Sequence, residues 1–176
     1  YSSMYEDVLN DFDNIIIECD PRLLNFYKRS FPKYKEKFVS LGTITNDDDE
    51  FKKIDYIIYA GSLGRYYRKN IKDFKNNSFL KVDEKKLQEM KRKLSIYKKK
   101  YKIGLSWKSF SDKFATDKSL NLKDLKKIFS LADCDIFNLQ YGVVEDEINS
   151  FNNTAKNKLL SIEGLDLINN FEGIAS

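Results

Sequence analysis

Short apolar runs alternate with helix-like segments along the 176 residues of this chain. The clearest case is "NIIIEC" (14–19), a β-branched run, followed directly by "DPRLLNFYKRSF" (20–31). In the second segment Asp20 stands at a helix N-cap and Pro21 at the first helical position, and four side chains are expected to be buried: Leu23, Leu24, Phe26 and Tyr27. Strands that alternate with helices usually pair in parallel. The alternation therefore predicts an α/β fold built on parallel sheets.

The same signals predict the remaining elements. Apolar runs bounded by turn residues predict strands at 36–42, 54–64, 102–107, 134–142 and 165–169. Three- and four-residue spacing of apolar side chains, with polar residues at the start, predicts helices at 82–102, 121–132 and 144–156. The acidic segment at 46–50 is expected to be a loop.

A lysine-rich helix divides the chain. Its expected apolar stripe is Leu87, Met90, Leu94, Tyr97 and Tyr101, and the rest of the helix is charged. This shift in composition predicts one domain over residues 1–81, a connecting basic amphipathic helix over 82–101 and a second domain over 102–176. A junction of this kind favours a ligand cleft.

The composition excludes several kinds of chemistry. The chain has no histidine, which rules out Ser-His-Asp or Cys-His catalysis and HExxH zinc sites within it. Cys19 and Cys134 both lie in apolar runs and are expected to be buried free thiols. No apolar run reaches the roughly 20 residues that span a bilayer. A cytoplasmic location without a membrane span is therefore expected.

Polar or small residues stand where three predicted strands end. These are Gly61-Ser62, Ser106-Trp107-Lys108 and Gln140-Tyr141-Gly142. Ligands of open parallel sheets bind beyond the carboxyl ends of the strands. Trp107 is therefore a candidate for stacking on a planar ring, and Gln140 for hydrogen bonds to the polar edge of a base or sugar. Lys108 or Lys118 is a candidate phosphate contact. The alternative, which the residue types alone favour, is a core Trp107 with solvated lysines.

Three charged segments are further candidates for a binding site. "GSLGRYYRK" (61–69) places Ser62 and Arg65 at a turn that leads into a helix, which suits an anion, although a solvated helix face fits as well. The acidic runs 47–49 and 145–147 lack the spacing of a metal loop and are expected to face solvent. The basic cluster could contact nucleic acid, but acidic neighbours dilute it and favour a solvated helix; its members are Lys91, Arg92, Lys93, Lys98, Lys99 and Lys100.

Seven segments, taken in order, resemble one family. They are "DPRLLNFYKRSFP" (20–32), "YAGSLGRYYRKNIKDF" (59–74), "FLKVD" (79–83), "KIGLSWKS" (102–109), "KSLNLKDL" (118–125), "IFNLQYGVVEDEI" (136–148) and "NNFEGIAS" (169–176). The chain resembles the glycosyltransferase-like region that follows tetratricopeptide repeats in bacterial proteins, which is similar to heptosyltransferases and O-GlcNAc-transferase-like enzymes. The order "GLSW…KSL…LQYG…E" carries most of the resemblance.

The resemblance implies a GT-B architecture, in which two Rossmann-like domains face a cleft and the second holds a nucleotide-sugar donor. Residues 1–81 would end the first domain, and the acceptor would be a protein or a glycan. Enzymes of this type generally need no metal, and the nucleotide-sugar is a substrate, so the resemblance implies neither a metal nor a cofactor. Members of the family have further sequence before and after the matching segments. The chain is therefore expected to be a fragment that is inactive alone, with its catalytic base elsewhere. A catalytically dead scaffold and a basic module that binds nucleic acid through residues 85–102 remain alternatives. The implied donor-binding residues are Ser106, Trp107, Lys108, Lys118, Ser119, Gln140, Tyr141 and Gly142.

Overall fold

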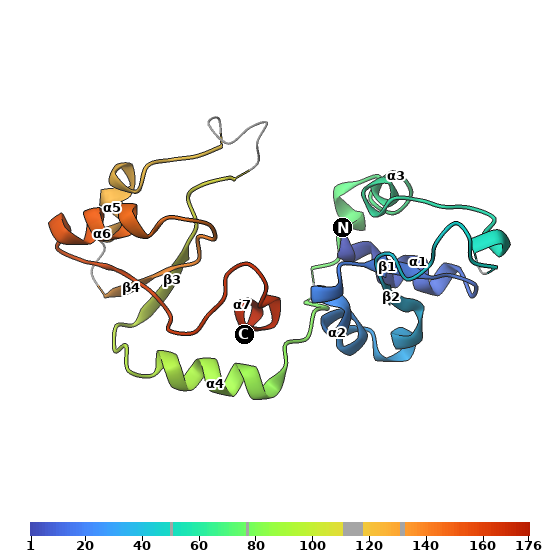
Figure 1. The fold of residues 1–176 in the computed structure, drawn as a ribbon, viewed down its shortest axis with the longest axis horizontal. Coiled ribbons are helices and arrows are strands. Elements are labelled where there is room, and N and C mark those ends of the chain that lie inside the picture. The colour runs from blue at the N-terminus through green and yellow to red at the C-terminus, as the bar shows by residue number, and fades with distance from the viewer. Residues whose placement is uncertain (50, 77, 111–117, 131–132) are drawn as a thin grey trace. The chain divides into compact units, whose positions relative to one another are not determined.

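The computed structural model describes residues 1–49, 51–76, 78–110, 118–130 and 133–176. The chain forms two compact units, Tyr1–Asp83 and Glu84–Ser176 (Figure 1). Both contain parallel strands joined through helices, so the protein has an α/β fold with short parallel sheets. None of the helices in the described ranges has the length and apolar character that a bilayer crossing requires.

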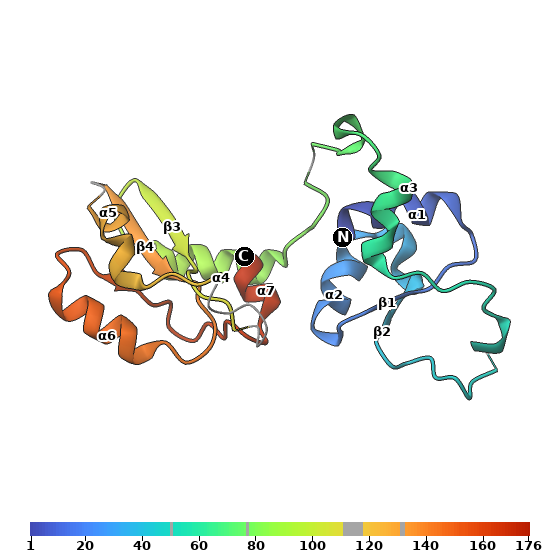
Figure 2. The ribbon, with the colours of Figure 1, turned by 90° about the horizontal axis from the view of Figure 1, so that it is seen from above.

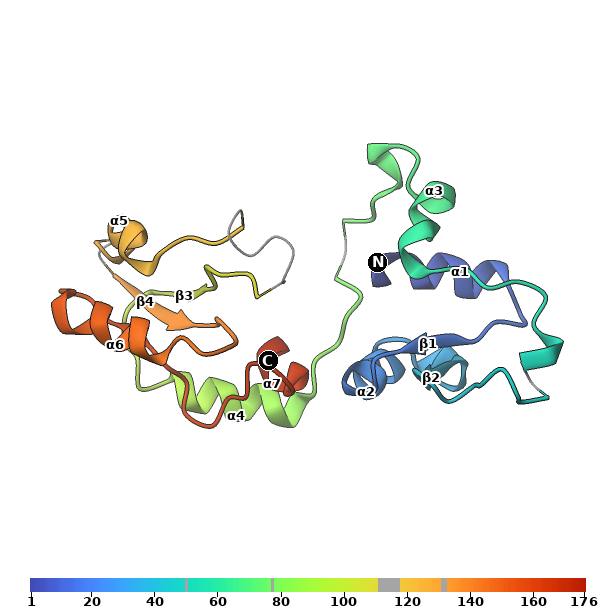
Figure 3. The same ribbon diagram turned by 45° about the horizontal axis from the view of Figure 1, so that its top comes forward.

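The first unit is built around a two-stranded parallel sheet. Strands β1 (Ile17–Cys19) and β2 (Phe38–Ser40) pair with Ile17 opposite Phe38, and helix α2 (Pro21–Ser30) connects them (Figure 3). The unit also contains α1 and α3 and five 3₁₀ helices among its described residues: α1 Tyr5–Asp11, α3 Gly64–Tyr67, η1 Ser2–Met4, η2 Pro32–Lys37, η3 Phe51–Lys53, η4 Ala60–Leu63 and η5 Ile71–Asp73.

Helix α2 begins as the sequence predicts. The Oδ1 atom of Asp20 accepts the backbone N–H of Arg22 at 2.9 Å, and Pro21 occupies the first helical position, where no N–H is needed. Phe26 is buried and Leu24 and Tyr27 pack against the core. The centre of this core is Phe38, whose side chain is fully buried. The other buried members are Met4, Tyr5, Val8, Leu9, Phe31 and Leu63.

An internal ion cluster holds residues 64–75 to helix α1. The Arg68 guanidinium lies 2.8 Å from an oxygen of Asp7 and its side chain is only 6% exposed, and Lys75 contacts the other Asp7 oxygen at 2.8 Å. Burial alone would raise the pKa of Asp7, but the two cations lower it overall. Arg68 is therefore a structural residue.

The second unit contains a three-stranded parallel sheet in the order β3-β4-β5. Tyr101 of β3 is opposite Cys134 of β4, and Ile136 of β4 is opposite Leu159 of β5. The elements are α4 Glu84–Leu94, β3 Tyr101–Leu105, η6 Leu122–Leu125, α5 Lys126–Phe129, β4 Cys134–Asn138, α6 Glu145–Thr154, β5 Leu159–Leu160 and α7 Phe171–Ala175.

Helices cover both faces of this sheet. Helices α5 and α6 lie on one side and α4 lies on the other, with α7 beside α4 (Figures 1 and 2). Alternate residues of β4 supply the two faces, as pleating requires. Ile136 enters the core under α5 and α6, while Phe137 packs edge-on against Tyr97, with ring centroids 4.9 Å apart. The main core is Trp107, Leu122, Phe129, Ile136, Val144, Ile148, Phe151 and Leu159.

Two predicted strands are wrong. Residues 54–59 form neither helix nor strand, and residues 60–63 form a 3₁₀ helix; Tyr56 is 93% exposed. A strand needs a hydrogen-bonded neighbour, and no described strand pairs with this apolar run. Residues 165–169 contain a turn at 167–169 instead of a strand, because the Asp166 side chain accepts the backbone N–H groups of Ile168 and Asn169.

Other boundaries also differ from the prediction. Helix α4 ends at Leu94, not at residue 102, because Tyr101 opens β3 and donates its N–H to the Asp133 carbonyl at 3.0 Å. The strands predicted at 14–19 and 36–42 shrink to three residues each. Asn121 stands at the N-cap of the predicted helix at 121–132, but its side chain makes no capping bond. Cys19 and Cys134 are buried free thiols, as predicted.

Phe151 is expected to carry much of the stability of the second unit. It is 1% exposed and its ring lies 4.5 Å from that of Phe129. Phe151→Ala leaves a cavity and should lower the free energy of unfolding by about 3–5 kcal/mol in urea titrations followed by the fluorescence of Trp107. Val143→Ala, at a position that is 88% exposed, should change it by less than about 0.5 kcal/mol. Equal losses would contradict the assigned core.

Candidate functional site

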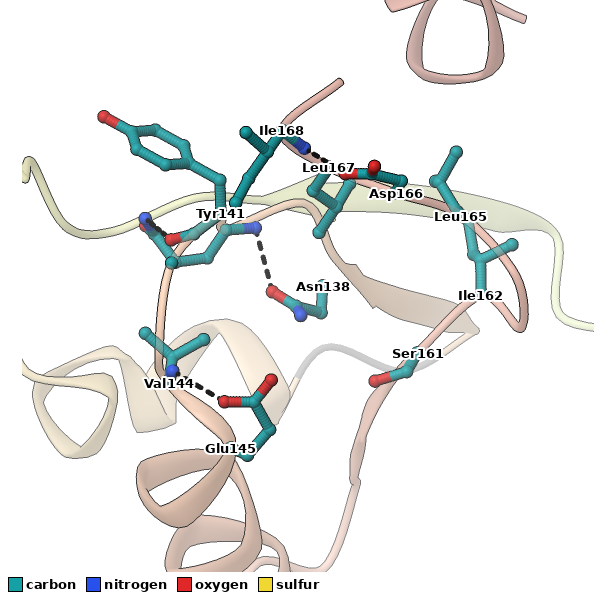
Figure 4. Close-up of a pocket in the computed structure, with 12 residues that line it drawn as sticks. Asn138, Tyr141, Val144, Glu145, Ser161, Ile162, Leu165, Asp166, Leu167 and Ile168 are labelled. Carbon is teal, nitrogen blue, oxygen red and sulfur yellow. Dashed lines mark hydrogen bonds between the residues drawn. The ribbon is translucent and has the colours of Figure 1, made fainter. Parts of the chain in front are cut away.

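A cavity of about 290 Å³ opens beyond the carboxyl ends of β4 and β5 (Figure 4). The chain after β4 lines one side, the first turn of α6 lines the floor and the turns after β5 line the other side. Its residues are Asn138, Gln140, Tyr141, Gly142, Val144, Glu145, Ser161, Ile162, Leu165, Asp166, Leu167 and Ile168. This is where open parallel sheets bind ligands, because the loops that follow neighbouring parallel strands meet at one edge.

Three polar side chains face the interior of the cavity. Figure 4 shows the Glu145 carboxylate and the Asn138 amide pointing toward each other, with the Ser161 hydroxyl directed into the same space. The Oε2 atom of Glu145 accepts the N–H of Val144 at 3.1 Å, and the Oδ1 atom of Asn138 accepts the N–H of Gln140 at 2.8 Å. Each group keeps hydrogen-bonding capacity for a ligand.

The cavity carries negative charge. Asp166 accepts N–H groups from Ile168 and Asn169, and these bonds lower the pKa of its carboxyl, so it stays ionised at neutral pH. With Glu145 this gives two carboxylates, and no lysine or arginine is among the lining residues. In the described parts of the chain no three acidic or cysteine side chains gather to hold a metal ion.

Gln140 joins the ends of β3 and β4. Its Oε1 atom accepts three hydrogen bonds from the chain after β3: Ser106 Oγ–H at 3.0 Å, Trp107 N–H at 2.8 Å and Lys108 N–H at 2.6 Å. Its Nε2 atom donates to the Tyr141 carbonyl, and the side chain is only 1% exposed. Both polar atoms of the Gln140 side chain are therefore bonded within the protein.

Glu147 of α6 holds the same loop from the other side. Its oxygens accept Leu122 N–H at 3.0 Å and Trp107 Nε1–H at 3.2 Å, and Lys108 Nζ lies 2.7 Å away. Burial raises the pKa of Glu147, but the hydrogen bonds from Leu122, Lys108 and Trp107 and the charge of Lys108 bring it below its usual value. Glu147 is thus an anion that neutralises Lys108.

The structure brings together four of the predicted site residues, and a fifth, Ser119, bonds to Ser109 next to them. Ser106, Trp107 and Lys108 meet at Gln140, and the Ser119 hydroxyl accepts the N–H of Ser109 at 3.1 Å. Trp107 is 4% exposed within the core, so stacking on a ligand would require it to leave that core. The burial supports the core alternative for Trp107.

The other predicted residues have different surroundings. Tyr141 and Gly142 line the cavity, and Lys118 is exposed. Ser62 and Arg65 belong to the first unit, where Ser62 lies in η4 rather than at the end of a strand, and Arg65 is exposed on α3.

The sequence did not predict Asn138 as a site residue, and it predicted that Glu145 and Glu147 face solvent. Asp47, Asp48, Asp49, Glu145 and Asp146 are exposed as predicted, but Glu147 is half-buried. A signal was available for Glu147. It lies three residues after Val144 and four before Phe151, both buried, so helical spacing puts it beside the apolar stripe.

The basic cluster is not one helix face. Lys91, Arg92 and Lys93 lie on α4, but Lys98, Lys99 and Lys100 follow its end. Lys93 pairs with Glu89 at 3.1 Å, and Lys99 donates to the Cys134 carbonyl at 3.1 Å. A continuous basic helix over 85–102 is therefore wrong.

Comparisons with protein-family models, with curated proteins and with solved structures gave no match.

Replacing Gln140 tests its role in joining the strands. Gln140→Leu removes the acceptor of the buried Trp107 N–H, the partly buried Lys108 N–H and the Ser106 hydroxyl, so we expect a loss of unfolding free energy on the order of 3 kcal/mol in urea titrations. Gln88→Leu, at an exposed position on α4, is the matched control and should change it by less than about 0.5 kcal/mol. If both variants behave alike, the hydrogen bonds at Gln140 are not stabilising.

Glu147 is expected to make stability depend on pH. Because its pKa is lowered on folding, its contribution is present above the unfolded value of about 4.3 and is lost as the pH falls through the folded value. In urea titrations between about pH 7 and pH 3, the free energy of unfolding should fall less for Glu147→Gln than for the wild type. Parallel profiles for wild type and Glu147→Gln would disprove the coupling.

Proposed function

We propose that the second unit binds the nucleotide part of a nucleotide-sugar donor and that the chain belongs to a glycosyltransferase of the GT-B type. The observation that carries the proposal is the cavity at the carboxyl ends of β4 and β5. The resemblance in segment order, from "GLSW" through "LQYG", supports the same reaction class. Catalytic residues are not assigned, and the acceptor is taken to be a protein or a glycan.

The polar side chains of the cavity suit a hydroxyl-rich ring. A carboxylate accepts from hydroxyl groups, an amide both donates and accepts, and a serine hydroxyl does either. Glu145, Asn138 and Ser161 supply one group of each kind, while aliphatic side chains such as Ile162 and Leu167 form walls against which the C–H faces of a sugar can pack. A ribose or hexose ring therefore fits the lining better than a fully apolar ligand.

The charge of the cavity orients the donor. Phosphate oxygens would meet Glu145 and Asp166 without a compensating cation among the lining residues, which is unfavourable at short distance. Lys108, the predicted phosphate contact in the chain after β3, is paired with Glu147 at 2.7 Å. In the proposed mode a sugar ring enters the cavity and the diphosphate points away from it.

Calorimetric titration of the whole chain with ADP, GDP, UDP, CDP and their sugar conjugates tests the proposal. We expect saturable binding of at least one nucleotide. Glu145→Gln should weaken it between about tenfold and a hundredfold, because a hydrogen bond to a charged acceptor is lost. Asp146→Asn, in the same helical turn but outside the cavity, is the matched control and should bind like the wild type.

Two results would contradict the proposal in different ways. Failure of the wild type to bind any nucleotide would leave the fold as a scaffold without donor binding. Binding that Glu145→Gln and Asp146→Asn leave equally unchanged would move the nucleotide away from this cavity.

A further inference from the structure

Two exposed aromatic rings stand together beside the cavity. Phe110 follows β3 and Tyr141 follows β4, and their ring centroids are 5.5 Å apart with planes inclined by 51°. Phe110 is 44% exposed and Tyr141 is 43% exposed. Tyr141 also lines the cavity, and Figure 4 shows its ring directed away from the Glu145 carboxylate. The aromatic pair therefore stands on one side of the cavity and remains partly open to solvent.

Gly142 allows the two rings to approach each other. Its φ of +90° lies in the left-handed region that favours glycine, and a Cβ atom built there would come within 2.5 Å of the Phe110 ring. Because that contact is with an aromatic ring and the backbone is already strained for other residues, a side chain at 142 would displace Phe110. The glycine after β4 thus leaves room for the ring of Phe110, which follows β3.

Nearby apolar side chains are exposed as well. Val143 is 88% exposed and Ile168, which lines the cavity, is 50% exposed. Large side chains exposed singly are ordinary, but apolar groups gathered beside a hollow indicate a contact surface. The polar side chains of the cavity and this apolar group differ in chemistry, so they suit different parts of one ligand.

We propose that Phe110 and Tyr141 form a stacking platform for the nucleobase of the ligand whose sugar ring enters the cavity. This inference rests on the proposed function, because it assumes that the ligand is a nucleotide. A base has a flat π-face, and exposed aromatic side chains bind such faces with little dependence on which base is present. The platform then supplies affinity for the base, while Glu145 and Asn138 select the sugar.

The test compares a ligand that carries a base with one that does not. The tightest binder among ADP, GDP, UDP and CDP and, separately, ribose 5-phosphate are titrated into the whole chain and its variants. Phe110→Ala and Tyr141→Ala should each weaken the nucleotide between about 5-fold and 150-fold and leave ribose 5-phosphate within about threefold of wild type. Phe110→Tyr and Tyr141→Phe, which keep the rings, should bind the nucleotide within about threefold of wild type.

Ile96→Ala is the matched control, because Ile96 is 70% exposed and does not line the cavity; this variant removes exposed apolar surface without removing a ring and should bind both ligands like the wild type. Unchanged urea midpoints, read from Trp107 fluorescence, establish that the variants remain folded. If the wild type binds the nucleotide and the alanine variants bind it equally well, or lose both ligands alike, the platform is disproved while the proposed function stands. If the wild type binds no nucleotide, the proposed function fails and the platform fails with it.

Discussion

The side chain of Gln140 holds the ends of two parallel strands in one position. Parallel strands bring their following loops to the same edge, but nothing in the backbone ladder fixes those loops relative to each other. One carbonyl oxygen of Gln140 accepts from Ser106, Trp107 and Lys108, so the loop after β3 is tied to the chain that follows β4. The cavity starts in that chain, and its shape therefore depends on this buried amide.

Glu147 fixes the same loop from helix α6, and the two anchors explain where a ligand can bind. Between them they engage the Trp107 backbone and indole N–H groups and the Lys108 ammonium. The Trp107 and Lys108 groups that the sequence predicts as ligand contacts are thus bonded within the protein and stabilise the loop. The cavity offers hydrogen-bonding groups from the next two strands instead: Asn138 and Glu145 at and after the end of β4, and Ser161 after β5.

Local signals were enough to predict much of the fold. The Asp20-Pro21 helix start, the strands at β3 and β4 and the apolar face of α6 all follow from short-range sequence patterns, and the structure has them. The features that failed depend on distant or competing partners. The apolar run 54–59 has no strand beside it in the described part of the chain, and β5 consists of only Leu159–Leu160 within a polar segment.

The sequence predicted that residues after β3 and β4 gather at the carboxyl edge of the sheet, and Gln140 does meet Ser106, Trp107 and Lys108 there. Strand topology predicts which residues lie close together at the edge of the sheet. It does not predict which of them form hydrogen bonds within the protein and which remain open to a ligand. Gln140 and Trp107 look like ligand contacts in sequence, since amide and indole groups often are. Their exposures of 1% and 4% show that they are internal partners, and burial is a property of the packed unit.

The acidic first turn of α6 decides what the cavity can select. A helix N-terminus normally attracts anions through its free N–H groups and its dipole. Here Glu145, Asp146 and Glu147 occupy that turn, and the Val144 N–H, just before the helix, is already bonded to Glu145. The turn therefore repels phosphate and offers a carboxylate to hydroxyl groups instead. On the proposed function, the cavity contacts the sugar ring, and the partly exposed rings of Phe110 and Tyr141 offer an aromatic surface for the rest of the donor.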